Sequence, residues 1–425
     1  MRPVSIRTAA ALCGGFALAM SVPASAAVDA KLLDMLKANG SISTAQHAEL
    51  QADLAKEQQA AAATKSSTQS DFEKKVAWAA KTQIKGDVRI RQENIDIDGE
   101  ADNGGRDKDR QRVRARLGAY TEINPQVDSG IRIATGGGND ARSTNQDLDG
   151  YFSKKSIWLD LAYIDYHPTA IKGLSLIGGK MNQPWVSMGD VIWDGDINPE
   201  GLALAYKLPL AGKTELFASA GHYTLKDNVD GNGVEFKNDL RLYAGQVGAR
   251  FAPIDDLKVT VGGSVYGYDN DKDSACGTNP STTPCALSVN GNTTTEFRLY
   301  EGFGQIDLTG LAVPLAFYGQ YVVNDESTDG HDTAWLAGAK TKVFGFSLDY
   351  NYRDVQRNAV VGAFTDSDFA NGTTGSRGHK VKVGYEIDKN FALGATYLMA
   401  DADFASRGGR DKDANILQLD AEVKF

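Results

Sequence analysis

From about residue 83 to the C-terminus, apolar and polar side chains alternate, which is the period of a strand with one buried face. The segment 346–353 (FSLDYNYR) follows this alternation at every position. Two segments, 157–166 (IWLDLAYIDY) and 297–308 (FRLYEGFGQIDL), do not keep to one parity. A β-bulge or a strand that is apolar on both faces would explain them.

Short turns and long polar loops alternate without exception between these segments, and together they delimit about sixteen strands of roughly ten residues. Short turns are expected at 124–126, 168–173, 209–213, 252–256, 309–313, around Gly345 and at 388–390. Long loops are expected at about 95–108, 137–155, 183–200, 225–238, 269–294, 325–332, 357–377 and 403–412.

An antiparallel meander with one tight end and one looped end is typical of a transmembrane up-and-down β-barrel. In lipid every backbone polar group needs a partner, so a spanning sheet has to close on itself. The sequence therefore predicts an all-β barrel of about 16 antiparallel strands over residues 82–425, with both of its ends on the periplasmic side. The alternative is a soluble β-sandwich or solenoid, which accounts poorly for the strict alternation of loop lengths.

The first 26 residues have the pattern of a cleaved signal peptide: basic residues, the apolar core 8–22, and Ala-Ser-Ala at 24–26. The core is too short for a membrane-anchoring helix, and Leu12 before Cys13 disfavours a lipoprotein. At the other end, 415–425 (NILQLDAEVKF) alternates up to Phe425 and resembles the C-terminal signal of outer-membrane barrels. We expect a protein of the cell outer membrane, surrounded by lipid and lipopolysaccharide.

Residues 27–81 have a helical period instead. Leucines recur at helical spacing over 32–36, Gly40 marks a stop, and Ser43 and Gln46 occupy the positions of a capping box. Weak heptad spacing follows. We expect a separate periplasmic helical or coiled-coil segment that self-associates.

The chain carries 45 basic and 55 acidic residues, a net charge of -10, which argues against a nucleic-acid partner. Its arginines nevertheless gather on one parity of the first three strands, opposite the apolar side chains. A barrel of this size leaves an aqueous channel, so these arginines would line it and favour anions. Alternatively, they are paired with acids such as Asp87 and Glu93. The arginines are Arg89, Arg91, Arg112, Arg114, Arg116 and Arg132.

The third long loop, QPWVSMGDVIWDGDINPEG, contains two tryptophans, more apolar surface than an exposed loop usually carries. We expect it to fold into the barrel, so that Asp190, Asp194 and Asp196 face the arginines at a constriction. Packing on a neighbouring subunit is the alternative. A calcium site at Asp194 and Asp196 is a further, weaker one.

Cys276 and Cys285 bracket a polar stretch and predict a loop disulfide, because a metal pair would need further ligands that the neighbouring sequence lacks. No metal or cofactor is expected. The five histidines are scattered and belong to no catalytic motif, so nothing indicates an enzyme. A surface adhesion or receptor barrel is the main alternative function, although the longest loop has only about 26 residues.

Several of these segments resemble the bacterial "putative porin" family, most strongly between about residues 84 and 208. The resemblance implies passive diffusion of small hydrophilic solutes or ions through the barrel, and a short helical segment before it. More distantly, the chain is similar to trimeric porins with an N-terminal coiled coil and an anion-selective arginine ladder, and this likeness, together with the weak heptad spacing, implies a homotrimer. The natural solute stays open. The resembling segments are 84–99 (IKGDVRIRQENIDIDG), 112–123 (RVRARLGAYTEI), 131–168, 178–186 (GGKMNQPWV) and 190–206 (DVIWDGDINPEGLALAY).

Overall fold

The computed structural model separates the chain into two compact units, the residues up to Ala77 and Trp78–Phe425. The predicted signal peptide, Cys276 and Cys285 lie outside the residues that the structure describes. The described residues are 30–98, 108–137, 140–227, 239–271, 287, 289–328, 330–403 and 411–425.

The first unit contains two helices, α1 (Ala30–Ala38) and α2 (Thr44–Ala80). The expected capping box is present: Ser43 N donates to Gln46 Oε1 at 2.9 Å, and Gln46 N donates to Ser43 Oγ at 3.2 Å. His47 of α2 contacts Asp34 of α1, with 2.9 Å between Nε2 and Oδ1. Within the described residues, neither helix is apolar over a length sufficient to cross a membrane.

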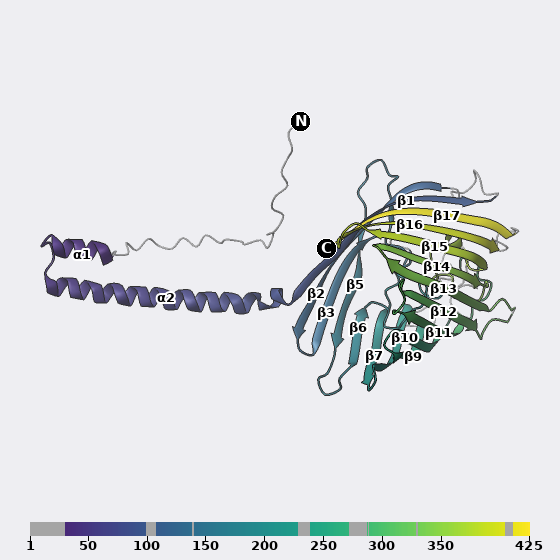
Figure 1. Ribbon diagram of the computed structural model, residues 1–425, viewed down its shortest axis with the longest axis horizontal. Coiled ribbons are helices and arrows are strands. Elements are labelled where there is room, and N and C mark those ends of the chain that lie inside the picture. Colours follow the sequence, from purple (N-terminus) through teal and green to yellow (C-terminus); the bar gives the residue numbers. More distant parts are fainter. Residues whose placement is uncertain are drawn as a thin grey trace. The chain divides into compact units, whose positions relative to one another are not determined.

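The second unit is a closed antiparallel barrel of sixteen strands, as predicted (Figure 1). Each strand pairs with its neighbours in sequence, and β1 pairs with β17 to close the ring. A two-residue strand, β4 (Gln146–Asp147), pairs with β2 from within a loop. The barrel strands are β1 Thr82–Ile97, β2 Lys108–Asn124, β3 Val127–Thr135, β5 Ile157–Tyr166, β6 Leu174–Lys180, β7 Glu200–Leu210, β8 Thr214–Lys226, β9 Leu240–Ile254, β10 Leu257–Asp269, β11 Arg298–Leu308, β12 Leu315–Asn324, β13 Thr333–Val343, β14 Phe346–Val355, β15 Ser376–Glu386, β16 Phe391–Asp403 and β17 Asp411–Lys424.

The connections alternate in length as the sequence predicts, so the barrel has a short-turn end and a long-loop end. The N-terminus of β1 and the C-terminus of β17 both lie at the short-turn end. There the last residue completes the ring: Phe425 N donates to Gly86 O at 3.0 Å, and Gly86 N donates to Phe425 O at 2.9 Å. The Phe425 ring covers Gly86 so closely that a Cβ on Gly86 would lie 2.6 Å from it.

The two segments of irregular parity have different explanations. In β5 the register shifts opposite Arg132 and Ile133, which is a bulge. In β11 the register is regular, but Leu299 and Phe303 are buried inside while Tyr300 is exposed outside, so both faces are apolar. Each explanation considered from the sequence therefore applies to one of the two strands.

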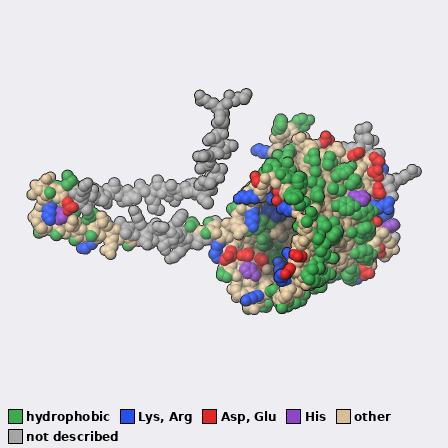
Figure 2. Space-filling view, in the orientation of Figure 1, with side chains coloured by type: hydrophobic (Ala, Val, Ile, Leu, Met, Phe, Trp, Pro, Cys, Tyr) green, Lys and Arg blue, Asp and Glu red, His purple; other side chains and the backbone are tan. Residues whose placement is uncertain are grey.

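The outward parity is apolar along most strands, as a lipid-facing wall requires. Ile90, Leu202 and Val247 are exposed large apolar residues of this kind. Figure 2 shows hydrophobic side chains covering much of the visible barrel wall, with charged side chains gathered toward its ends. The inward parity therefore holds the polar groups that could act on a solute.

Candidate solute channel in the barrel interior

The predicted arginines lie side by side on the inner wall. In the pairing of β1 with β2, Arg89 is opposite Arg114 and Arg91 is opposite Arg112. The neighbouring Val88 and Ile90 are exposed on the outside, which places the arginines on the inner face. Arg132 follows on β3. The strand register thus assembles the basic residues that the sequence indicated.

Acidic residues of the same wall neutralise most of these arginines. Asp87 pairs with both Arg114 and Arg116, with Nε to carboxylate oxygen distances of 2.8 and 2.7 Å. Arg91 makes a two-pronged contact with Asp420 of β17, at 2.7 Å from Nε and 3.0 Å from Nη2. Such bidentate pairs are strong and geometrically defined.

Some of the remaining ion pairs of these arginines use acidic residues from loops. Arg112 Nε lies 2.9 Å from Asp147 of β4, and Arg132 pairs with Asp160 of β5. Arg110, which was not among the predicted site residues, lies on the same face and contacts Asp147 at 3.2 Å. The pairing alternative considered from the sequence therefore describes most of this wall.

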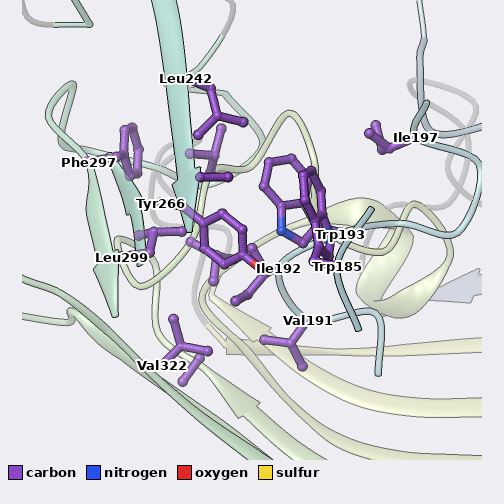
Figure 3. Packing of buried hydrophobic residues seen from close by; sticks show 14 of the residues in the cluster. Trp185, Val191, Ile192, Trp193, Ile197, Leu242, Tyr266, Phe297, Leu299 and Val322 are labelled. Atoms are coloured by element: carbon purple, nitrogen blue, oxygen red, sulfur yellow. The ribbon is translucent and has the colours of Figure 1, made fainter. Parts of the chain in front are cut away.

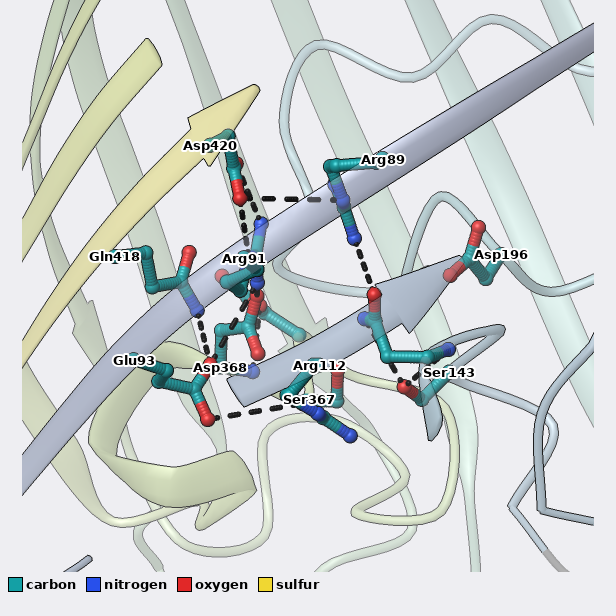
Figure 4. A network of polar contacts seen from close by, with 12 residues as sticks. Arg89, Arg91, Glu93, Arg112, Ser143, Asp196, Ser367, Asp368, Gln418 and Asp420 are labelled. Atoms are coloured by element: carbon teal, nitrogen blue, oxygen red, sulfur yellow. Dashed lines mark hydrogen bonds and ion pairs between the residues drawn. The ribbon is translucent and has the colours of Figure 1, made fainter. Parts of the chain in front are cut away.

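Arg89 is the least neutralised of the six. Its Nη2 donates a hydrogen bond to the neutral Asn145 Oδ1 at 2.7 Å, whereas its Nε lies 4.0 Å from Asp420 (Figure 4). Any excess positive potential of this wall should consequently be strongest near Arg89.

The third long loop, residues 181–199, packs against the inner wall of its own barrel, which is the expected inward folding. Trp185 and Trp193 are buried, 4.9 Å apart between ring centroids, and Trp193 lies edge-on to Tyr266 of β10 at 5.3 Å (Figure 3). Gln246 of β9 exchanges hydrogen bonds with Val186 N and O at 2.8 and 2.9 Å. Other buried residues of this cluster are Val191, Ile192, Ile197, Tyr223, Leu299, Val322 and Leu336.

The three acidic residues of this loop have different partners. Asp196 contacts one of the predicted arginines, at 3.4 Å from Arg116 Nη1. Asp190 instead lies 2.7 Å from Arg353 Nη2 and 2.5 Å from Lys380 Nζ, two cations that were not predicted.

Asp194 accepts hydrogen bonds from two backbone N–H groups, those of Asp196 and Ser367, each at 2.9 Å. Within the described residues no group of three or more candidate ligands is placed to hold a metal ion. The hydrogen bonds of Asp194 therefore stabilise the conformation of the inward loops.

A second loop, residues 356–375 between β14 and β15, also folds inward and was not predicted to do so. It pairs with the first loop through the backbone: Asp194 N donates to Phe364 O at 2.7 Å, and Asp366 N donates to Asp190 O at 3.0 Å. The buried run 359–361 (AVV) was its signal in the sequence, because a solvated loop seldom carries three consecutive apolar residues.

The acids of this second loop meet the cations of the wall. Asp366 lies 3.1 Å from Arg353 Nη1 and 2.9 Å from Lys380 Nζ. Asp368 lies 3.1 Å from Arg91 Nη1. The two loops therefore form one layer that is attached to the charged wall by ion pairs.

The carboxyl groups of this layer differ in acidity. Burial and the charge of Asp366 raise the pKa of Asp194 to about 8, against the lowering effect of its two backbone hydrogen bonds. Burial alone would also raise the pKa of Asp190, but Arg353 and Lys380 hold it well below its usual range. Asp190 is thus ionised at neutral pH, and Asp194 is protonated.

The family described as "Putative porin" matches residues 98–304 and 318–425 of this chain. A 32-residue stretch is 78% identical to "Phosphate starvation-inducible protein 1" of Pseudomonas fluorescens, covering 8% of this chain and 82% of that protein.

Among solved structures, Pseudomonas putida OprB at high pH has a TM-score of 0.53 at 12% identity, covering 83% of this chain and 96% of that one. A Salmonella typhi OmpF complex with daunomycin has a TM-score of 0.48 at 14% identity, covering 81% and 97%. At these identities the OprB likeness concerns the fold alone.

Proposed function

Because the chain belongs to the family described as "Putative porin", we propose that it is an outer-membrane porin whose water-filled channel lets small hydrophilic solutes diffuse passively. The observation that carries the proposal is the closed sixteen-stranded barrel with an apolar outer wall and a charged inner one. Such a wall shields a polar solute from lipid and replaces part of its hydration shell.

We place the solute path along the charged wall of β1, β2 and β17. The main apolar cluster of the two inward loops lies on the side of β8 to β13, and the second loop also packs against β16 and β17 through Phe369 and Ala370. Some side chains on the charged side keep exposure, for example 22% for Arg116 and 17% for Asp420, whereas Arg91, Arg112 and Arg114 are buried. Both signs of charge lie along this path, so we expect weak ion selectivity.

A solute-specific anion channel is the second candidate. The incompletely neutralised Arg89 favours it, and so does the name of the matched Pseudomonas fluorescens protein, which refers to induction by phosphate starvation. Removing the charge of Arg112, Arg114 or Arg116 should then shift selectivity toward cations. If the selectivity does not change, these arginines are not at the constriction.

The assembly and the processing of the chain are further parts of the proposal. We propose removal of residues 1–26 on export, residues 27–81 as a periplasmic segment that joins three copies, residues 82–425 as the barrel, and a disulfide between Cys276 and Cys285. A heat-sensitive oligomer band on a detergent gel would support the trimer. A monomer band without heating would contradict it.

The deciding experiment is conductance in a planar bilayer. Purified protein should give large ohmic steps, and the reversal potential in a salt gradient then reports selectivity. An adhesion barrel whose lumen is closed would give no conductance, and that result would overturn the porin proposal.

A further inference from the structure

We propose that the long-loop end of the barrel binds small aromatic, or similarly flat and apolar, solutes that carry one anionic end. The site is a cavity of about 640 Å³ between the inward loops and strands β7 to β9. This volume lies within the usual range of small-molecule sites. Binding at this cavity is separate from the passive diffusion proposed above and can be measured without it.

One side of the cavity is apolar and partly aromatic. Trp193 and Phe364 stack with ring centroids 5.4 Å apart and an interplanar angle of 25°. Tyr223, Leu240 and Leu242, from β8 and β9, also line the cavity. An aromatic ring placed here would exchange water for flat apolar surfaces. A channel mouth that handles only hydrophilic solutes has no need of such a surface.

The polar end of the cavity is Arg142, in the loop between β3 and β5. Its guanidinium is fixed by three contacts: Nη1 donates to Gly362 O at 3.1 Å and to Gly372 O at 3.3 Å, and Nε donates to Asp140 Oδ1 at 3.2 Å. In the part of the chain that the structure describes, Nη2 makes no hydrogen bond. A donor held in place in this way is preorganised for a carboxylate.

The charges around the rim of the cavity argue against small inorganic anions as its ligands. Lys180 pairs with Glu200 at 2.7 Å, and Asp140 accompanies Arg142, so that the two cations are balanced by two anions. A balanced rim does not concentrate small inorganic anions. It suits a monoanion whose apolar body supplies most of the binding free energy.

The test uses the full-length protein in detergent and isothermal titration calorimetry with 2-naphthoate. We expect one site per chain, weaker binding of 2-naphthalenemethanol, which lacks the charge, and no measurable binding of acetate, which lacks the apolar body. If acetate binds as tightly as 2-naphthoate, the proposed site is wrong. This series needs no variant and is independent of any folding defect.

Two variants locate the site. Arg142→Gln should weaken 2-naphthoate binding at least about tenfold, since a charged hydrogen bond is lost, and Ala363→Trp should fill the cavity and abolish binding. Arg377→Gln, at an exposed position on β15, is the matched control and should leave affinity unchanged. Unchanged affinity in both site variants would overturn the proposal. Binding without bilayer conductance would contradict only the porin function, and conductance without binding only this site.

Discussion

The interior of the barrel has two sides that are stabilised in different ways. On the side of β8 to β13 the two inward loops are held by apolar packing around Trp193 and Tyr266. On the side of β1, β2 and β17 the wall is a network of ion pairs around Asp87 and Asp420. Packing fills space and keeps water out, whereas a charged wall can border water, so this division supports the solute path proposed above.

The largest expected effect comes from breaking the packed side. Trp193→Ala should lower the free energy of unfolding by about 3–5 kcal/mol, the usual cost of deleting a buried aromatic side chain. It should also raise single-channel conductance, because the loop loses its anchor. Trp335→Ala, at a 40% exposed position on β13, is the control and should cost less. Denaturant unfolding and bilayer recordings measure both effects, and equal losses in the two variants would contradict the anchoring role.

The ion pairs that attach the two inward loops to the barrel wall should be almost as important for stability. Arg353 is 1% exposed and pairs with Asp190 and Asp366 of the two loops. Arg353→Gln leaves the buried Asp366 and the partly exposed Asp190 with Lys380 as their remaining close cation among the described residues, and we expect a loss of about 3 kcal/mol. Arg298→Gln removes a half-exposed ion pair on β11 and should change stability by less than about 1 kcal/mol. A cost for Arg353→Gln as small as that control would refute the attachment.

A smaller effect is expected from pH. The pKa of Asp194 is about 8 in the folded protein, above the value of about 3.9 for an unfolded chain. The folded state therefore holds this proton more tightly, and the stability that the proton contributes is lost as pH rises toward 8.

We expect melting experiments to show a decrease of at most about 2.7 kcal/mol between pH 6 and pH 9, because each pH unit below the folded pKa contributes about 1.36 kcal/mol. Asp194→Asn should remove it, whereas Asp255→Asn, in an exposed turn, should not. A pH dependence that persists in Asp194→Asn would assign it to another group.

The smallest effect concerns the charged side. Arg89→Gln should lower the anion-to-cation permeability ratio about twofold, since the least neutralised cation of the wall is lost. Stability should change little, because no carboxylate of the described residues lies closer than 4.0 Å to this side chain. Arg250→Gln, near the short-turn end, should leave the ratio unchanged. Reversal potentials in a salt gradient measure this, and equal ratios in wild type and Arg89→Gln would place the selective region elsewhere.

The barrel was predictable because a strand has a period of two. Alternation assigned Arg112 and Arg114 to the inner face, and alternating loop lengths predicted the antiparallel order. The partners of the arginines were less accessible. Asp420 and Glu422 reach β1 and β2 only because the ring closes between β1 and β17, and local pattern contains no information about that register.

The inward loops were also only partly predictable from local sequence pattern. The tryptophans of the first loop were distinctive enough to predict burial, whereas the apolar run at 359–361 in the second loop is made of smaller residues and was overlooked. Which cation meets Asp190 depends on tertiary placement. Arg353 and Lys380 are far from it in sequence and are brought there by β14 and β15.

The contact between Gly86 and Phe425 has a consequence for when the barrel can form. Nearly the entire sequence of the barrel lies between these two residues, so the ring cannot close until Phe425 has been synthesised. Contacts between such distant residues form slowly. Until then the first and last strands present unpaired edges, which pair readily with other chains. The polypeptide therefore depends on being kept apart from its copies until the ring has closed.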